Sequence, residues 1–90
     1  MNANSLEKYE EFRTLEFDRP LSRVLRITLN KPDTLNSVSA DMHRDLVRIW
    51  PVISEDKGTS VVMVRGAGKA FSAGGDFNLV EENASSFQAR

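Results

Sequence analysis

Residues 66–77 read Gly-Ala-Gly-Lys-Ala-Phe-Ser-Ala-Gly-Gly-Asp-Phe and decide how the rest of this chain is interpreted. The stretch holds four of the five glycines and follows the apolar run Val-Val-Met-Val at 61–64. Such a run, bounded by turn residues, is typical of a strand buried on both faces. A glycine-rich loop after such a strand carries backbone N–H groups to the sheet edge where open α/β folds bind ligands. Because Gly74-Gly75 can adopt positive φ and allow close approach, we expect the loop to offer amides to a ligand oxygen.

The composition of the 90 residues limits the class of protein. The net charge is −1, with both signs scattered along the chain, which indicates no nucleic-acid partner and no anionic membrane partner. There is no cysteine and only one histidine, so we expect no disulfide, no thiolate chemistry and no metal site of ordinary type. No apolar run approaches the roughly 20 residues of a membrane helix, and the first residues resemble no targeting signal. We therefore expect a cytoplasmic protein.

Upstream of the glycine-rich stretch, the pattern predicts two strands and a helix. Residues 12–17 and 24–29 alternate between apolar and polar side chains and are joined by a polar connector, which predicts an antiparallel hairpin. Ser39 is a good N-cap for the helix that follows. The apolar stripe of that helix consists of Met42, Leu46, Ile49, Trp50 and Ile53. Pro51 lies within this stripe, so we expect a kink or an early end near Trp50.

The order of these elements predicts an α/β fold. A helical crossover between the second and third predicted strands implies that these two strands lie parallel in one sheet. We expect a flexible N-terminus over residues 1–11, a folded unit over 12–82 and a polar tail over 83–90.

Two nucleotide-binding motifs are incomplete in the glycine-rich stretch. The dinucleotide fingerprint requires a glycine at the position of Phe71, and the phosphate loop requires Ser or Thr at the position of Ala70. Asp76 is a candidate catalytic carboxylate, but an aspartate after two glycines more often accepts backbone N–H groups and fixes the loop.

The remaining titratable candidates are His43 on the predicted helix and the pair Glu81 and Glu82. Each has a catalytic interpretation and a simpler one as a solvated surface residue, and the polar surroundings favour the simpler one.

Two motifs together carry a family resemblance. Residues 30–38, Asn-Lys-Pro-Asp-Thr-Leu-Asn-Ser-Val, and residues 66–77 are similar to motifs of the enoyl-CoA hydratase/isomerase (crotonase) family, and the similarity covers about residues 12–82. The resemblance implies the N-terminal portion of a crotonase-like spiral of ββα units that binds acyl-CoA thioesters. In that family the residue after the Ala-Gly pair donates one of the two N–H groups of an oxyanion hole, and Gly75 stands at that position. The resemblance places coenzyme A against Asp33, Thr34, Leu35, Ala73, Gly74, Gly75, Asp76 and Phe77.

The chemistry that the resemblance implies depends on backbone N–H groups more than on side chains. A thioester enolate carries negative charge on its oxygen, and removing one oxyanion-hole donor typically costs about 3 to 4 kcal/mol of barrier. Family members are much longer, and their second oxyanion amide and proton-handling glutamates lie on later segments, so this chain carries about half of an active site. Coenzyme A would enter as part of the substrate, with no metal and no covalently bound cofactor. A full-length member would be a homo-oligomer, either a trimer or a dimer of trimers.

Two alternatives to an enzyme stay open. One is a non-catalytic fragment that docks onto full-length family members, and the other is a module that binds coenzyme A without turnover. Turnover of a short enoyl-CoA by the purified chain would exclude both.

Overall fold

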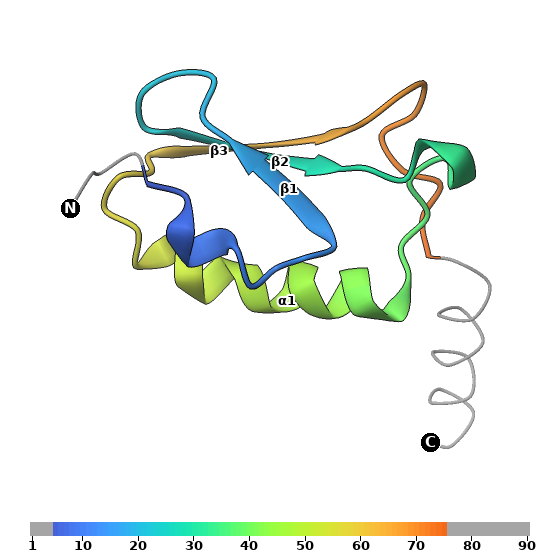
Figure 1. The fold of residues 1–90 in the computed structure, drawn as a ribbon, viewed down its shortest axis with the longest axis horizontal. Coiled ribbons are helices and arrows are strands. Elements are labelled where there is room, and N and C mark those ends of the chain that lie inside the picture. Colours follow the sequence, from blue (N-terminus) through green and yellow to red (C-terminus); the bar gives the residue numbers. More distant parts are fainter. Residues whose placement is uncertain (1–4, 76–90) are drawn as a thin grey trace, which may run out of the picture.

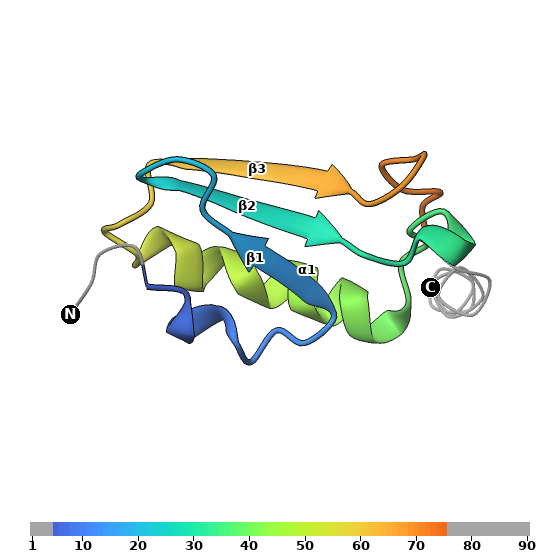
Figure 2. The ribbon, with the colours of Figure 1, turned by 45° about the horizontal axis from the view of Figure 1, so that its top comes forward.

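The computed structural model describes residues 5–75, which form three strands, one α-helix and two short 3-10 helices. The elements are a 3-10 helix at Glu7–Tyr9, β1 (Leu15–Asp18), β2 (Val24–Leu29), a 3-10 helix at Pro32–Thr34, α1 (Ala40–Ser54) and β3 (Val61–Gly66). The strands lie in the order β1-β2-β3, with β1 antiparallel to β2 and β2 parallel to β3. Figures 1 and 2 show α1 lying along one face of this sheet. The predicted hairpin, crossover helix and parallel strand are therefore confirmed.

The core lies between α1 and the central strand. Leu25, Ile27 and Leu29 alternate along β2, so all three point to one face, and all three are buried. Met42 and Ile49 of α1 are fully buried in the same cluster. The strand β1 begins at Leu15, later than the predicted start at residue 12.

The helix α1 begins as predicted and ends later than predicted. The Ser39 hydroxyl accepts a hydrogen bond from the Met42 N–H at 3.2 Å and caps the helix. The helix continues through Pro51 to Ser54, so the expected early end near Trp50 is wrong. Ile53, beyond the proline, packs against the core, and this packing offsets the backbone hydrogen bond that proline removes.

Trp50 does not belong to the buried stripe of α1. Its side chain is 46% exposed, whereas the adjacent Ile49 is fully buried. Successive helical residues are about 100° apart, and Trp50 shares its face with Val47, three residues earlier, which is also exposed. The two apolar residues thus lie on the outer side of the helix, and the prediction that Trp50 belongs to the core is wrong.

The strand β3 is covered on less of its surface than predicted. Val61 is 52% exposed, Met63 45% and Val64 37%, so the expectation of a strand buried on both faces is wrong for the part of the chain that the structure describes. The reason is that α1 covers one face of the sheet and that, among residues 5–75, β3 lies at the edge with only β2 as a neighbour. Within residues 5–75 the opposite face of β3 has no second layer packed on it.

The N-terminal segment contributes to the core from Tyr9 onward. The Tyr9 ring is buried and stacks on Phe17 of β1 with ring centroids 5.0 Å apart. Phe12 is buried in the same cluster. The predicted boundary of the folded unit at residue 12 is therefore too late.

A buried carboxylate ties this segment to the loop between α1 and β3. Asp56 forms ion pairs with Lys8 at 3.1 Å and with Arg19 at 3.0 Å. Its other hydrogen-bond donors are the Tyr9 hydroxyl, the Gly58 N–H and the Thr59 hydroxyl. Three segments that are distant in sequence are thus joined at one charge.

The surroundings of Asp56 shift the pKa of two groups. Burial alone would raise the pKa of the Asp56 carboxyl, but hydrogen bonds from Tyr9, Thr59, Gly58 and Lys8 hold it well below its usual value. Burial and the hydrogen bond to Asp56 raise the pKa of the Tyr9 hydroxyl to about 12. The carboxylate is therefore ionised and Tyr9 is neutral across the ordinary pH range.

Candidate functional site

The two loops that carry the motifs lie side by side at one end of the sheet. Because β2 and β3 are parallel, their carboxyl ends meet at the same edge, where Leu29 is registered with Gly66. The loop after β2 contains the 3-10 helix Pro32–Thr34, and the loop after β3 contains the diglycine. Figure 1 shows these two loops together, although they are far apart in the sequence.

The two loops are held together by backbone hydrogen bonds. The Ala73 N–H donates to the Leu35 carbonyl at 2.8 Å, and the Val38 N–H donates to the Gly74 carbonyl at 2.8 Å. Val38 and Gly75 form an isolated parallel bridge. The end of the glycine-rich loop therefore runs as a short extended segment along residues 35–38.

The three backbone amides of the Ala73-Gly74-Gly75 corner differ in their hydrogen-bond acceptors. The Ala73 N–H is donated to Leu35, and the Gly74 N–H is donated to the Ser72 hydroxyl at 3.0 Å. Within residues 5–75, no hydrogen-bond acceptor is paired with the Gly75 N–H. All three residues are exposed. Two of the three amides at this corner are thus donated inside the loops, and Gly75 is the one that differs.

The backbone of the corner requires glycine at position 74. Gly74 has φ +92°, in the left-handed region that L side chains rarely adopt, and a Cβ built on it would meet no atom of residues 5–75 within 4 Å. Within the part of the chain that the structure describes, nothing fills the space beside the corner. Phe71, which could have filled it, is itself exposed.

Asn36 connects the two loops, although it was not among the predicted site residues. Its side chain is fully buried and donates hydrogen bonds to the carbonyls of Ala67 and Ala70, both at 2.8 Å. Its side-chain oxygen accepts from the Lys31 N–H at 2.7 Å. The residue has φ +56°, which asparagine tolerates better than most side chains. An asparagine in a short loop after a proline turn was the available signal, since that residue type combines left-handed backbone with both donors and acceptors.

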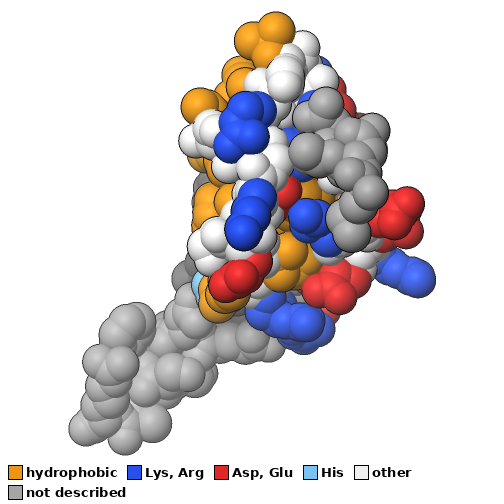
Figure 3. Space-filling model, turned by 90° about the vertical axis from the view of Figure 1, so that its left-hand side faces the viewer, with side chains coloured by type: hydrophobic (Ala, Val, Ile, Leu, Met, Phe, Trp, Pro, Cys, Tyr) orange, Lys and Arg blue, Asp and Glu red, His pale blue; other side chains and the backbone are white. Residues whose placement is uncertain are grey.

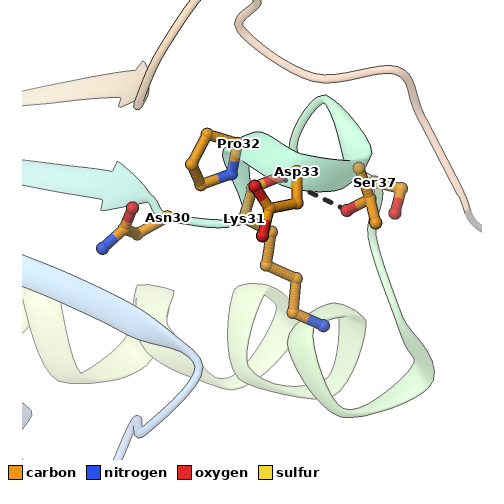
Figure 4. Close-up of a pocket in the computed structure, with 6 residues that line it drawn as sticks. Asn30, Lys31, Pro32, Asp33 and Ser37 are labelled. Atoms are coloured by element: carbon orange, nitrogen blue, oxygen red, sulfur yellow. Dashed lines mark hydrogen bonds between the residues drawn. The ribbon is translucent and has the colours of Figure 1, made fainter.

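The first motif lines an open pocket of about 490 Å³, within the range of small-molecule sites. Figure 4 shows side chains from the end of β2 and from the 3-10 helix around it. The lining residues are Asn30, Lys31, Pro32, Asp33, Thr34 and Ser37. Asp33 and Thr34, two of the predicted binding residues, thus border a pocket. Leu35 is half exposed but does not line it.

Several predicted candidates lie elsewhere. Asp76, Phe77, Glu81 and Glu82 lie outside the described residues, as does the predicted tail at 83–90. His43 is exposed on α1. In the described part of the chain, no three His, Asp or Glu side chains are grouped so that they could hold a metal ion. No helix described here is both long and apolar enough to span a bilayer.

The fold and the paired loops define an α/β unit with a glycine-rich loop at the carboxyl end of a parallel strand. A family model described as enoyl-CoA hydratase/isomerase matches residues 24–90. The chain therefore belongs to the enoyl-CoA hydratase/isomerase (crotonase) family, and the predicted family and fold class are confirmed.

Individual relatives agree with this assignment. A mevalonyl-coenzyme A hydratase of Beauveria bassiana is 33% identical over 70 residues, which is 78% of this chain and 25% of that protein. A probable 3-hydroxyisobutyryl-CoA hydrolase of Arabidopsis thaliana is 37% identical over 62 residues, or 69% of this chain and 16% of that protein. The crystal structure of an enoyl-CoA hydratase/isomerase from Mycobacterium paratuberculosis has a TM-score of 0.68 and 42% identity, covering 77% of this chain and 27% of that one. The chain thus spans about a quarter or less of the length of these relatives.

Proposed function

We propose that this chain binds an acyl-CoA thioester and that the Gly75 N–H donates a hydrogen bond to the thioester oxygen when negative charge develops there. The observation that carries the proposal is the difference among three neighbouring amides. Those of Ala73 and Gly74 are donated within the loops, whereas that of Gly75 has no acceptor among residues 5–75. The names of the similar hydratase and hydrolase support coenzyme A thioesters as the substrate class.

The proposed role depends on preorganisation. A backbone N–H carries a fixed dipole, and the hydrogen bonds from Ala73 to Leu35 and from Val38 to Gly74 hold the corner before any ligand arrives. A donor that is already oriented stabilises an enolate oxygen without reorganising during the reaction. In this proposal the second oxyanion donor and the acid and base groups come from sequence beyond these 90 residues. The chain thus supplies one half of the site.

The pocket at the first motif provides a place for the coenzyme. It lies on the loop that pairs with the diglycine corner, so one ligand can contact both loops. Lys31 contributes a positive charge to its lining, which suits the phosphates of coenzyme A. We propose that Asp33, Thr34 and Leu35 border the coenzyme, together with residues 73–77.

An NMR titration tests the proposal. A 15N-labelled sample of the whole chain is titrated with a short acyl-CoA and, separately, with free coenzyme A, which lacks the acyl carbonyl. We expect the Gly75 amide resonance to move further with the acyl-CoA than with free coenzyme A. The amides at the C-terminal end of α1, which lie on a different element, serve as the internal reference. No movement of residues 73–75 at a saturating acyl-CoA concentration would refute thioester binding by this loop.

The exposed edge of the sheet favours a second candidate function, which is docking onto a full-length family member. Val61, Met63 and Val64 of β3 are exposed, and β3 pairs only with β2 within residues 5–75. An unpaired edge strand is a ready template for another strand. Figure 3 shows that hydrophobic side chains also reach the surface on one end of the molecule. Size-exclusion chromatography of the chain mixed with a full-length homologue tests this candidate, and separate elution of the two proteins would reject it.

A further inference from the structure

Asn36 uses all of its polar groups, and most of them reach the glycine-rich loop. Its side-chain amide donates to the carbonyls of Ala67 and Ala70, and its backbone carbonyl accepts a hydrogen bond from the Ser72 hydroxyl at 2.7 Å. The remaining two groups bind Lys31: the side-chain oxygen accepts from its N–H, and the Asn36 N–H donates to its carbonyl at 2.8 Å. A fully buried amide with this many partners is costly to disturb, since each unpaired group would lose its hydrogen bond away from water.

The contacts of Asn36 continue along the chain to the diglycine corner. The Ser72 hydroxyl that donates to Asn36 also accepts the Gly74 N–H, so the orientation of residue 74 depends on the Asn36 backbone. On either side of Asn36, Leu35 accepts the Ala73 N–H and Val38 donates to the Gly74 carbonyl. Residues 35–38 therefore bind residues 67–75 at successive points, and the last of these is the bridge between Val38 and Gly75.

We propose that Asn36 is a positioning residue for the Gly75 amide. By holding the loop at Ala67, Ala70 and Ser72, it sets the direction in which the Gly75 N–H points. The inference rests on the proposed function, because it assigns to Asn36 the geometry of a donor that binds the thioester oxygen. It assigns no contact between Asn36 and the substrate.

The chemistry of the site explains why asparagine is suited to this position. The position needs left-handed backbone, one acceptor for Lys31 and two donors for the carbonyls of the loop. Aspartate keeps the shape, tolerates the backbone and keeps the acceptor, but it faces the two carbonyls with an oxygen instead of an N–H group. Asn36→Asp therefore removes the link to the loop with little change in volume.

The experiment compares the affinities of the whole chain for a short acyl-CoA and for free coenzyme A. The ratio of the dissociation constant for free coenzyme A to that for the acyl-CoA reports the contribution of the acyl group, whose carbonyl the Gly75 amide is proposed to bind. We expect this ratio to fall about two- to tenfold in Asn36→Asp, which corresponds to weakening one hydrogen bond. Ser72→Ala, a milder change that removes the hydroxyl between Asn36 and Gly74, should lower the ratio in the same direction. Ile49→Val loses core packing without touching either loop and should leave the ratio unchanged.

The outcomes separate this inference from the proposed function. If both affinities fall equally in Asn36→Asp and in Ser72→Ala, or if Ile49→Val lowers the ratio as much, Asn36 only supports the fold and the inference is rejected. If Asn36→Asp does not fold, the ratio measured in Ser72→Ala decides.

If the wild-type chain shows no preference for acyl-CoA, the proposed function fails. Amide exchange without ligand then decides the inference. Faster exchange at Ala73 and a shifted Gly75 resonance in Ser72→Ala, with neither change in Ile49→Val, would support it, and unchanged signals would overturn it.

Discussion

A methyl group added at Gly66 tests how closely residues 70–71 and the Asn36 side chain pack on the end of β3. Gly66 ends β3, and a Cβ built there would lie 2.2 Å from the Phe71 carbonyl oxygen and 2.3 Å from that of Ala70. It would also lie 2.7 Å from the side-chain nitrogen of Asn36. Two of these three atoms are backbone, so a side-chain rotation cannot relieve the contact. Ordinary separations are about 3.5 Å or more, so in Gly66→Ala the chain at residues 70–71 must move by about 1 Å.

The magnitude follows from two contributions. Overpacking of this kind costs about 1 to 3 kcal/mol. The movement also breaks the hydrogen bond from Asn36 to the Ala70 carbonyl, which adds about 1 kcal/mol. We therefore expect Gly66→Ala to lower the free energy of unfolding by about 2 to 4 kcal/mol, a large share of the stability of so small a domain.

The assay is urea unfolding followed by circular dichroism, with Gly74→Ala as the matched control. The control adds the same methyl group elsewhere in the glycine-rich stretch, where no atom of residues 5–75 lies within 4 Å and the positive φ opposes it. Its expected cost is about 1 kcal/mol. If Gly66→Ala is no less stable than Gly74→Ala, residues 70–71 and Asn36 do not pack on Gly66 as described. The Gly66→Ala variant should also lose the acyl-CoA-dependent movement of the Gly75 resonance, because the displaced residues 70–71 lie just before that residue in the chain.

Three further predictions concern the parts that hold the fold together. Tyr9, whose folded pKa is about 12 against about 10 when unfolded, contributes stability that is complete below pH 10 and is lost as pH rises toward 12. The loss of unfolding free energy should reach about 2 to 3 kcal/mol. Unfolding measured against pH in the alkaline range checks this, because Tyr9→Phe should lose less stability than the wild type. Equal pH dependence of the two proteins would refute the prediction. Asp56→Ala removes the buried carboxylate that binds Lys8, Arg19 and Tyr9 and should cost about 3 to 5 kcal/mol in urea unfolding; a cost below 1 kcal/mol would contradict the role of this carboxylate in the fold. Ser39→Ala removes the N-cap of α1 and should cost about 1 kcal/mol, measured in the same way, whereas no loss would mean that the cap hydrogen bond contributes nothing.

The strands and the helix could be predicted because they depend on local periodicity. Alternation in β2, the cap at Ser39 and the apolar stripe of α1 are each contained within a few residues, so the pattern alone indicated the element. The errors arose where the neighbours matter. Trp50 fits an apolar stripe as well as Ile49 does, and only the placement of α1 on the sheet determines which of the two is buried. The exposure of β3 likewise depends on which other elements pack on the sheet.

The candidate site was predictable in part for the same reason. The diglycine and the proline-containing motif are contiguous in sequence, so both loops and their role at the ends of parallel strands could be recognised from residue types. The pairing between them involves residues more than thirty positions apart, such as Asn36 and Ala70. No local pattern records such a contact, so Asn36 and Ser72 were not predicted.

The amino-acid sequence by itself determined the family, the order of the elements and the glycine-rich corner, because periodicity and short motifs are properties of neighbouring residues. Only the tertiary structure decided which amides of that corner are donated to acceptors within residues 5–75 and which one is not, because a hydrogen bond forms between groups that folding brings together. The distinct position of Gly75 therefore follows from the contacts of residues 35–38 with the loop, rather than from the glycine itself.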